Sequence, residues 1–427
     1  MREMKDSGIE WIGNIPATWE RCKIKNVISS IGSGTTPTSS NIDYYNSEDI
    51  CWIQSGDLYK TSYISNTAVS LSAKALHLSA LQIYAAPFIV VAMYGASVGN
   101  IAISTIDACS NQACCCIKPD NNNDLKFMYY WLSMCKIDFL SQSIGGGQPN
   151  ISQSKIKNQF YYRPQLSEQK VIANFLDSKC SEIDAISADI QKEIEILEQY
   201  KRSVITEAVT KGLNPDVEMK DSGIEWVGNI PVHWDTIPIR YLFAECRLKN
   251  ILNQEKTALK FTYGTIIKKA NFDSDSDEYV ANTMTNYTVV YPGTIMINGL
   301  NLNYDFVSQR VGLVKDRGAI TSAYLAIVPG SRVVSEYANY QLKSWDYAKA
   351  FHNMGTGVRK TLDFSELGKK YFVTPSIEEQ SKIVAFLDSK CKEIEAIIAS
   401  KKQQLTVIDS YKKSLIYEYV TGKKEVI

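Results

Sequence analysis

The stretch MKDSGIEWIGNIPATWE, residues 4–20, returns in the middle of the chain as MKDSGIEWVGNIPVHWD, residues 219–235. Thirteen of the seventeen positions are identical, among them two tryptophans, two glycines and the proline. The chain therefore contains the same structural segment twice.

A second repeated pair lies downstream of the first. Residues 168–210 match residues 379–421, and both copies contain the hexapeptide FLDSKC. The segments between the repeats, roughly 21–160 and 236–370, are not visibly alike. The chain is thus one module written twice, and a protein of this kind is built to present two different surfaces in one fixed geometry.

The bulk composition is that of an ordinary globular protein, with 45% hydrophobic and 22% charged residues. At 427 residues the chain is long enough for two or more domains, each with a core. The formal net charge is zero, so there is no basic signal over the whole molecule for nucleic acid. A basic face balanced by acidic helices, or a partner that supplies positive charge, stays open.

The sequence also predicts the cell compartment. No apolar run reaches the ~18 residues of a membrane helix, and the first residues have no hydrophobic core of a signal peptide. The run Cys114-Cys115-Cys116 has no CxxC pair or nearby His to complete a zinc motif. The ten cysteines are therefore expected to be reduced thiols, with these three in a buried strand, and the protein is expected in the cytoplasm.

A long amphipathic helix is predicted in each downstream repeat. Residues 167–211 contain neither Pro nor Gly, and their apolar residues recur in steps of three, four or seven. Ser376 and Glu379 have the form of a capping box at the start of the second helix. Gly212 and Gly422 stand where C-terminal caps are expected.

A helix of ~40 residues is ~60 Å long and cannot bury its apolar stripe alone. The simplest partner is its own copy, which predicts a two-helix coiled coil. Steps of four, four and three from Ile186 to Leu197 depart from a strict heptad, so weak supercoiling is expected there. Docking of each helix on its own domain remains an alternative. The residues predicted to pair the helices are Ile183, Ile186, Ile190, Ile194, Leu197, Ile394, Ile397, Leu405 and Ile408.

Both variable segments combine short runs of β-type residues with turns rich in Gly, Asn, Ser and Pro. Examples are residues 83–93 and 100–106 in the first segment, and 261–267 and 324–328 in the second. A short helix is predicted near residues 125–140. Each segment is therefore expected to form an α+β domain with a curved, mostly antiparallel sheet.

The sequence contains no recognisable catalytic constellation. Its three histidines, His77, His233 and His352, stand in separate contexts, which argues against a metal or acid–base cluster. Three glycine-rich stretches, at 32–37, 145–150 and 354–360, lack the residues of a Rossmann loop or a P-loop. Such loops could still hold a nucleic-acid phosphate, and plain tight turns are the alternative.

Side chains that read DNA bases are present in both variable segments. Asn and Gln pair with adenine edges, and Arg and Lys with guanine or phosphate. For any single residue, an ordinary surface role remains the alternative, and the basic pairs 268–269 and 359–360 are the stronger candidates for phosphate contacts. The candidate DNA-binding residues are Thr36, Tyr59, Lys60, Tyr63, Tyr94, Gln148, Asn150, Lys268, Lys269, Asn298, Asn301, Asn303, Tyr304, Arg310, Arg359 and Lys360.

Further motifs accompany the two copies of KDSGIEW and the Glu-Gln pairs that begin the predicted helices. They are GTTP at 34–37, WIQSGDL at 52–58, YGA at 94–96, NQA at 111–113, GQPNI at 147–151 and GVR at 357–359. With these motifs the chain resembles, over essentially its whole length, the DNA-specificity subunit of type I restriction–modification enzymes. The second variable segment lacks the Gly-Thr-Pro and Ser-Gly-Asp-Leu signatures, so it resembles a different recognition-domain subtype.

The resemblance implies a noncatalytic subunit with two target recognition domains and an internal pseudo-twofold repeat. It implies that the helices pair antiparallel, act as a spacer and dock two methyltransferase subunits, which a restriction subunit joins. S-adenosylmethionine, ATP and Mg are then expected on those partners and none on this chain. Each domain would read one half of an asymmetric bipartite DNA target. The implied boundaries are 1–160 and 214–372 for the recognition domains, and 161–213 and 373–427 for the long-helix regions.

Two other function classes compete with this interpretation. The chain could be a coiled-coil scaffold with ligand-binding end domains, which would show no preference for DNA sequence. It could also be a self-sufficient DNA methyltransferase or nuclease, although the Asn/Asp-Pro-Pro-Tyr/Phe motif of amino-methyltransferases is absent.

Overall fold

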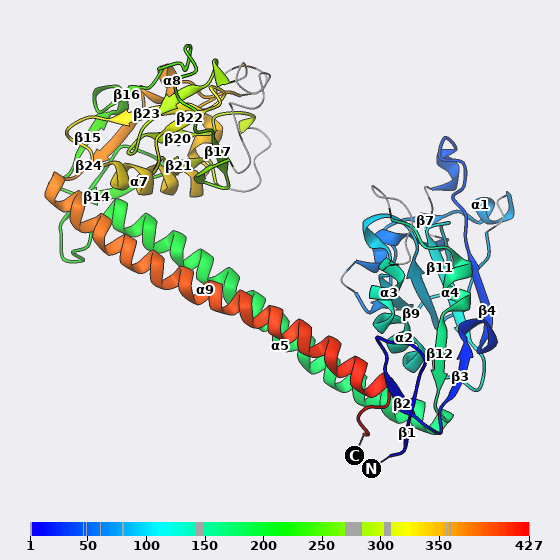
Figure 1. Cartoon of the computed structure of the whole chain (residues 1–427). Helices are drawn as coiled ribbons and strands as arrows, with labels where there is room; N and C mark the ends of the chain where they lie inside the picture. The colour runs from blue at the N-terminus through cyan, green and yellow to red at the C-terminus, as the bar shows by residue number, and fades with distance from the viewer. Residues whose placement is uncertain are drawn as a thin grey trace. The chain divides into compact units, whose positions relative to one another are not determined.

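The computed structural model of the chain (Figure 1) describes residues 2–426 except 46, 48, 60, 79–80, 142–148, 270–283, 303–308, 356 and 358–359. The chain divides into two compact units. Unit 1 comprises Met1–Ile190 and Gln403–Ile427, and unit 2 comprises Gln191–Lys402. Each unit combines a sheet domain with two helix segments, so the predicted α+β fold class is confirmed.

The main sheet of unit 1 has five strands and is covered on both faces. Along its central strand, Ile89 and Val91 pack in one core cluster with Trp131, whereas Val90 packs in a second cluster. Successive residues of a strand point to opposite faces, so the alternation places one cluster on each side of the sheet. In spatial order the strands are β4 (Ile28–Ser33), β11 (Cys114–Pro119), β8 (Phe88–Ala92), β9 (Ile101–Ser104) and β6 (Tyr63–Ile64).

Smaller elements complete unit 1. Among its described strand pairs, β6–β9 and β5–β10 run parallel and the others antiparallel. The predicted helix near residues 125–140 is present as α2 and α3. The elements are the pairs β1 (Met4–Asp6) with β2 (Asn14–Pro16) and β3 (Glu20–Lys23) with β12 (Phe160–Arg163), the sheet β10 (Ala108–Ser110), β5 (Ile50–Ile53) and β7 (Ser70–Leu71), and the helices α1 (Ala73–Leu78), α2 (Leu125–Met134), α3 (Lys136–Ser141) and α4 (Gln153–Asn158).

Unit 2 repeats this plan although its sheet segment shares no visible sequence likeness with that of unit 1. Ile295 and Ile297 pack with Leu342 in one cluster, and Met296 packs in another, so this sheet is also covered on both faces. Its strands stand in the order β16 (Phe243–Glu245), β23 (Leu325–Pro329), β20 (Ile295–Ile297) and β21 (Val311–Leu313), which matches β4-β11-β8-β9 of unit 1.

The remaining described elements of unit 2 include two strand pairs that match β1–β2 and β3–β12 of unit 1. They are β13 (Met219–Asp221) with β14 (Asn229–Pro231), β15 (Asp235–Pro238) with β24 (Tyr371–Thr374), β17 (Leu259–Thr262) with β18 (Thr265–Lys268), β19 (Thr288–Val290) with β22 (Gly318–Ile320), and the helices α7 (Ser335–Tyr347) and α8 (Phe364–Leu367).

Two long helices, α5 (Leu166–Lys211) and α9 (Ile377–Val420), contribute a segment to each unit (Figure 1). Within each unit the α9 residue number falls as its α5 partner's number rises, so the paired segments run antiparallel. The contacts that show this are Phe175–Tyr419 and Asp184–Lys412 in unit 1, and Glu193–Lys401 and Lys201–Glu395 in unit 2.

The interface between the paired segments of α5 and α9, which we call the helix seam, excludes two of the residues predicted to pair the helices. Ile186 is 51% exposed and Ile397 is 41% exposed, whereas their neighbours Ser187 and Ile398 face the seam. With Ser187 and Ile398 in place of Ile186 and Ile397, the buried and half-buried positions recur in alternating steps of three and four residues. The helix seam therefore follows a heptad, and the expected departure from a heptad is wrong. These positions are Cys180, Ile183, Ser187, Ile190, Ile194, Leu197 and Lys201 on α5, and Cys391, Ile394, Ile398, Lys401, Leu405, Ile408, Lys412 and Leu415 on α9.

The FLDSKC repeat attaches each sheet domain to its helix. Asp177 accepts a hydrogen bond from the Tyr130 hydroxyl at 2.7 Å, and Asp388 accepts one from the Tyr340 hydroxyl at 2.7 Å. Burial, followed by these carboxylates, raises the pKa of both tyrosines far above the usual value. The repeated aspartate is therefore a fastening point between the common frame and the variable domain.

All ten cysteines are unpaired thiols, as predicted. Cys114, Cys115 and Cys116 lie in the buried strand β11, and burial raises the pKa of the Cys116 thiol to about 12. A thiol with so high a pKa is a poor nucleophile and a poor metal ligand at neutral pH. Across the described part of the chain, no helix has the length and apolarity to cross a membrane.

Candidate nucleic-acid interface

In unit 1, four strand ends meet at one edge of the main sheet. Strand register places Ser33 at the end of β4 opposite Cys115, Ala92 at the end of β8 opposite Cys114, and Ile101 at the start of β9 opposite Val91. The loops that leave these ends, residues 34–37, 93–100 and 111–113, are therefore neighbours. We call them, with residues 149–151, the unit 1 loop edge.

Close backbone packing fixes the first loop of this edge. A Cβ atom on Gly34 would lie 1.5 Å from the carbonyl oxygen of Ser110, so only glycine fits there. The Gly34 N–H also donates to the Ser110 hydroxyl at 3.1 Å. This arrangement presents Thr36, whose hydroxyl bonds to the side chain of Gln112 at 2.5 Å. Gln112 is exposed beside Thr36 and was missed as a candidate contact, although it belongs to the NQA motif.

The second part of the edge joins two distant segments. Tyr94 and Asn150 form a β-bridge, and the Gly95 N–H donates to the Pro149 carbonyl at 2.9 Å. Tyr94 and Asn150 are both exposed. The structure thus brings together three of the residues predicted to contact DNA, Thr36, Tyr94 and Asn150, along the unit 1 loop edge.

The other candidates in unit 1 have different positions. Tyr59 is exposed and follows a 3₁₀ turn, Ser55–Leu58, that packs near the Tyr94 loop. Tyr63 lies on β6 next to the long helix, where burial and then the Asp177 carboxylate raise the pKa of its hydroxyl. Lys60 and Gln148 lie outside the described residues.

Unit 2 has an equivalent edge at the ends of β20 and β21, which we call the unit 2 loop edge and define as residues 298–302 and 360–362. Arg310 lies beneath it and is 6% exposed. Its guanidinium donates to the carbonyl oxygens of Asn298 at 2.7 Å, Leu300 at 2.9 Å and Asn301 at 3.4 Å. This corrects the prediction that Arg310 contacts DNA, because the side chain instead supports the backbone of the loop.

Arg310→Met should destabilise unit 2 around this loop. The substitution keeps most of the buried volume and leaves three carbonyl groups without their charged donor, at a cost of about 2–4 kcal/mol in the free energy of unfolding. Chemical denaturation followed by hydrogen exchange of residues 298–302 measures the effect. Arg317→Met is the matched control, since Arg317 is largely exposed and pairs with Glu255 at 2.8 Å, and it should change the free energy by less than about 1 kcal/mol. Equal effects of the two substitutions would contradict the supporting role.

Two of the candidate DNA-binding residues are exposed on the unit 2 loop edge. The Leu302 N–H donates to the Lys360 carbonyl at 3.2 Å, which places Lys360 beside Asn301. Asn298 is half-buried, and its side chain accepts from the Leu300 N–H at 3.2 Å. Asn301 and Lys360 are thus the described candidates that face solvent here, and Asn298 shapes the turn.

The basic pair at 268–269 lies elsewhere in unit 2. Lys268 pairs with Asp316 at 3.2 Å, and the Lys269 N–H donates to the Ala258 carbonyl at 2.9 Å. Both residues are at the end of the β17–β18 hairpin opposite its turn. The remaining candidates, Asn303, Tyr304 and Arg359, lie outside the described residues.

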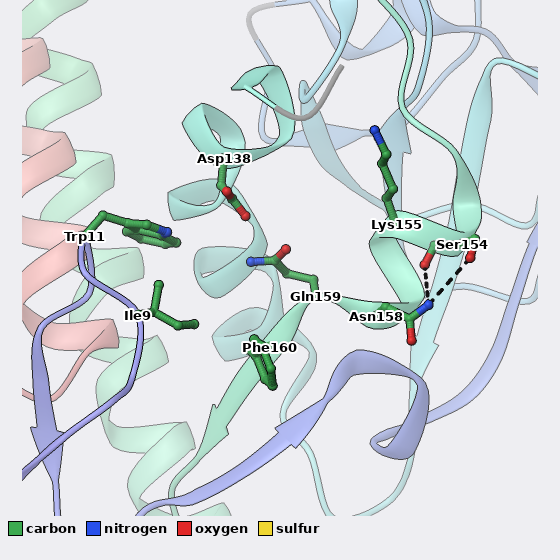
Figure 2. Close-up of a pocket in the computed structure, with 8 residues that line it drawn as sticks. All are labelled: Ile9, Trp11, Asp138, Ser154, Lys155, Asn158, Gln159 and Phe160. Carbon is green, nitrogen blue, oxygen red and sulfur yellow. Dashed lines mark hydrogen bonds between the residues drawn. The ribbon is translucent and has the colours of Figure 1, made fainter. Parts of the chain in front are cut away.

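Unit 1 also contains a pocket of about 360 Å³ that no sequence pattern predicted (Figure 2). Trp11 of the repeated segment borders it. In unit 2 the equivalent Trp226 packs against Trp345 of α7, with ring centroids 5.5 Å apart, and the position equivalent to Trp345 is Cys135 in unit 1. The smaller cysteine leaves Trp11 without that partner. The lining residues are Ile9, Trp11, Asp138, Ser154, Lys155, Asn158, Gln159 and Phe160.

Within the described ranges, no group of three or more His, Cys, Asp or Glu side chains is placed to hold a metal ion. What the two loop edges do offer is a row of amide, hydroxyl, aromatic and ammonium groups on rigid sheets. Such groups donate to, accept from or stack on the edges and faces of bases.

Comparison with known proteins shows what the chain is similar to. Residues 16–196 match the model of the type I restriction modification DNA specificity domain. The type I restriction enzyme MjaVIII specificity subunit of Methanocaldococcus jannaschii is 24% identical over 319 residues, covering 70% of each chain. The MjaIX specificity subunit of the same organism is 30% identical over 192 residues, covering 44% of this chain and 43% of the relative.

The fold agrees with that of a solved structure. A chain from work on the structural basis of complex assembly and conformational transition of the type I R-M system superposes with a TM-score of 0.68. The match covers 95% of this chain and 98% of the other at 12% identity, so it concerns the fold alone. Repeat, fold and sequence likeness agree: residues 16–196 match a type I restriction modification DNA specificity domain, and the chain is similar over 70% of its length to a type I specificity subunit.

Proposed function

We propose that this chain is the noncatalytic DNA sequence-recognition subunit of a type I restriction–modification complex. The observation that carries the proposal is the pair of loop edges. One repeated frame holds two sheets that share the order of four strands, and the loops on those sheets differ in sequence. A coiled-coil scaffold without sequence preference would have no use for two such rigidly supported and dissimilar surfaces, so that alternative is not favoured.

Each unit reads one half of the target in this proposal. Because the unit 1 edge carries an aromatic ring, Tyr94, and no basic residue, whereas the unit 2 edge carries Lys360 and no aromatic residue, the two half-sites differ and the target is asymmetric. The antiparallel helices α5 and α9 set the distance between the half-sites. A helix suits this task because the number of its residues fixes its length.

The partners in the proposal are double-stranded DNA, two methyltransferase subunits and a restriction subunit. S-adenosylmethionine, ATP and Mg belong to those subunits, and this chain binds none of them. The formal net charge of zero supports a division of labour in which the partners supply much of the attraction to phosphate. A complex that modifies chromosomal DNA is expected in the cytoplasm.

Exchange of one variable segment tests the proposal. Replacing residues 21–160 with the same segment of a related specificity subunit should change one half-site and preserve the other. The exchange is structurally mild, because it joins the chain where β3 and β12 pair, with Tyr161 opposite Cys22. Methylome sequencing of a strain that carries the hybrid and its methyltransferase reads both half-sites directly.

The reciprocal exchange of residues 236–370 is the matched control and should change the other half-site only. A hybrid that alters both half-sites, or methylation without sequence preference in the parent strain, would overturn the model of two independent readers.

A further inference from the structure

The hairpin β17–β18 of unit 2 carries a tyrosine in a backbone conformation that tyrosine rarely adopts. Thr262 pairs with Thr265, so Tyr263 and Gly264 are the two central residues of the turn. Their φ angles are +46° and +71°. A turn with positive φ at both positions favours Asn-Gly, and a tyrosine at the first position is strained. The Tyr263 side chain is 79% exposed, so burial does not offset the strain.

The turn packs closely against strand β21 of the main sheet. A Cβ atom on Gly312 of β21 would lie 3.0 Å from the Phe261 ring and 3.1 Å from the Gly264 carbonyl oxygen, so the hairpin crosses β21 where that strand has no side chain. Ile266 is buried on the same side. An exposed aromatic ring on a fixed support loses little conformational entropy when it binds.

The position of the turn connects it to the unit 2 loop edge. A Cβ atom on Gly264 would lie 3.3 Å from the Val311 carbonyl oxygen, at the start of β21. Val311 pairs with Ile297, and the loop that contains Asn301 begins at the next residue. The turn that contains Tyr263 therefore lies next to the loop that we propose to read DNA, and Tyr263 is not part of that loop.

We propose that the Tyr263 ring contacts the bases of the half-site read by unit 2 and helps to set its specificity. The inference rests on the proposed function. A flat ring with a polar hydroxyl can stack on an exposed base face or act as a wedge at a base step, and its hydroxyl can bond to a base edge. Strain that persists at an exposed residue is explained when the side chain has a binding role.

Binding by the assembled complex tests this role. The complex of this chain with its methyltransferase subunits is titrated with a duplex that carries the methylome-defined target, and with a duplex in which the unit 2 half-site is scrambled. Tyr263→Asn removes the ring and suits the positive φ, so the turn is retained. We expect Kd for the target duplex to rise at least tenfold and Kd for the scrambled duplex to stay within twofold, with Tyr263→Phe intermediate.

Tyr241→Asn is the matched control, because Tyr241 is 69% exposed and precedes β16 at the opposite end of the sheet. It should leave both Kd values unchanged. If the unaltered complex discriminates between the duplexes and Tyr263→Asn binds the target as tightly as before, the inference fails and the proposed function stands. If the unaltered complex does not discriminate, the proposed function itself fails. A Tyr263→Asn chain that no longer assembles with the methyltransferase would identify the ring as a protein contact and overturn the inference.

Discussion

Gln169→Leu should loosen the sheet domain of unit 1 and leave that of unit 2 intact. Gln169 lies on α5 and is fully buried. Its side-chain oxygen accepts a hydrogen bond from the Asp124 N–H at 2.8 Å. Its side-chain NH₂ group donates to the backbone carbonyls of Pro164 at 2.9 Å and Asn122 at 3.4 Å. Leucine fills a similar volume and offers no polar atom. Each buried group left without a partner costs about 1–3 kcal/mol, so the free energy of unfolding of unit 1 should fall by about 3 kcal/mol or more.

Hydrogen exchange on the full chain measures this effect locally. A loss of ~3 kcal/mol raises the opening equilibrium ~10²-fold, so the amides of α2, whose N-cap is Asp124, should exchange about that much faster. Gln380→Leu is the matched variant. Gln380 is also fully buried, and its bonds to Val334, Pro375 and Arg332, at 2.8, 2.9 and 3.0 Å, repeat those of Gln169.

The Gln380 variant should accelerate exchange in α7 and spare α2. Acceleration of both helices by either substitution would show that the two units open together, which contradicts their description as separate compact units.

The sequence repeat marks both glutamines as features that the two units share. The Glu-Gln pairs at 168–169 and 379–380 were recognised as repeated helix starts, and the sequence alone did not show that the glutamine is the docking group. A glutamine in the first turn of a helix is usually solvated. Only the folded chain shows that the first turn of α5 is covered by the N-terminus of α2, which turns a polar residue into a buried link.

The helix seam shows where periodicity is sufficient and where it is not. The apolar repeat predicted both long helices, and they begin and end close to the expected residues. It did not fix the phase, because Ser187, Lys201, Lys401 and Lys412 occupy seam positions that a count of apolar residues leaves out. Lysine can lie in a seam when its methylene stem packs there and its ammonium reaches a carboxylate on the facing helix, as Lys412 does with Asp184 at 2.6 Å.

The recognition surfaces were predicted only in part for a similar reason. The residue type of Arg310 predicted a contact with DNA. In the structure its guanidinium instead donates to backbone carbonyls of the 298–302 loop and supports that loop. Conversely, Tyr263 was not proposed, because a tyrosine inside a β-type run looks like an ordinary strand residue. Its distinguishing feature is a positive φ angle, and no property of the neighbouring sequence except Gly264 points to it.

Lengthening both long helices by seven residues should move the two half-sites apart without altering either one. Seven residues add one heptad, which keeps the seam positions in phase and extends the helix by ~10 Å. The insertions belong between Asp184 and Glu193 on α5 and between Lys401 and Lys412 on α9, so that each ion pair, Asp184–Lys412 and Glu193–Lys401, keeps its partner. The retained pairs hold the two helices in register on both sides of the insertion.

The expected change in the target is a longer spacer. Base pairs rise ~3.4 Å each, so ~10 Å corresponds to about three base pairs if the helices run along the DNA, and to fewer if they are inclined. Methylome sequencing should therefore show both original half-sites with a spacer longer by about one to three base pairs. The same insertion in α5 alone is the control, and it should abolish methylation, because Glu193 and the seam residues beyond it then lose their partners on α9. Normal methylation at the original spacer after the double insertion would mean that the helices do not set the distance between the two half-sites, and that some other contact does.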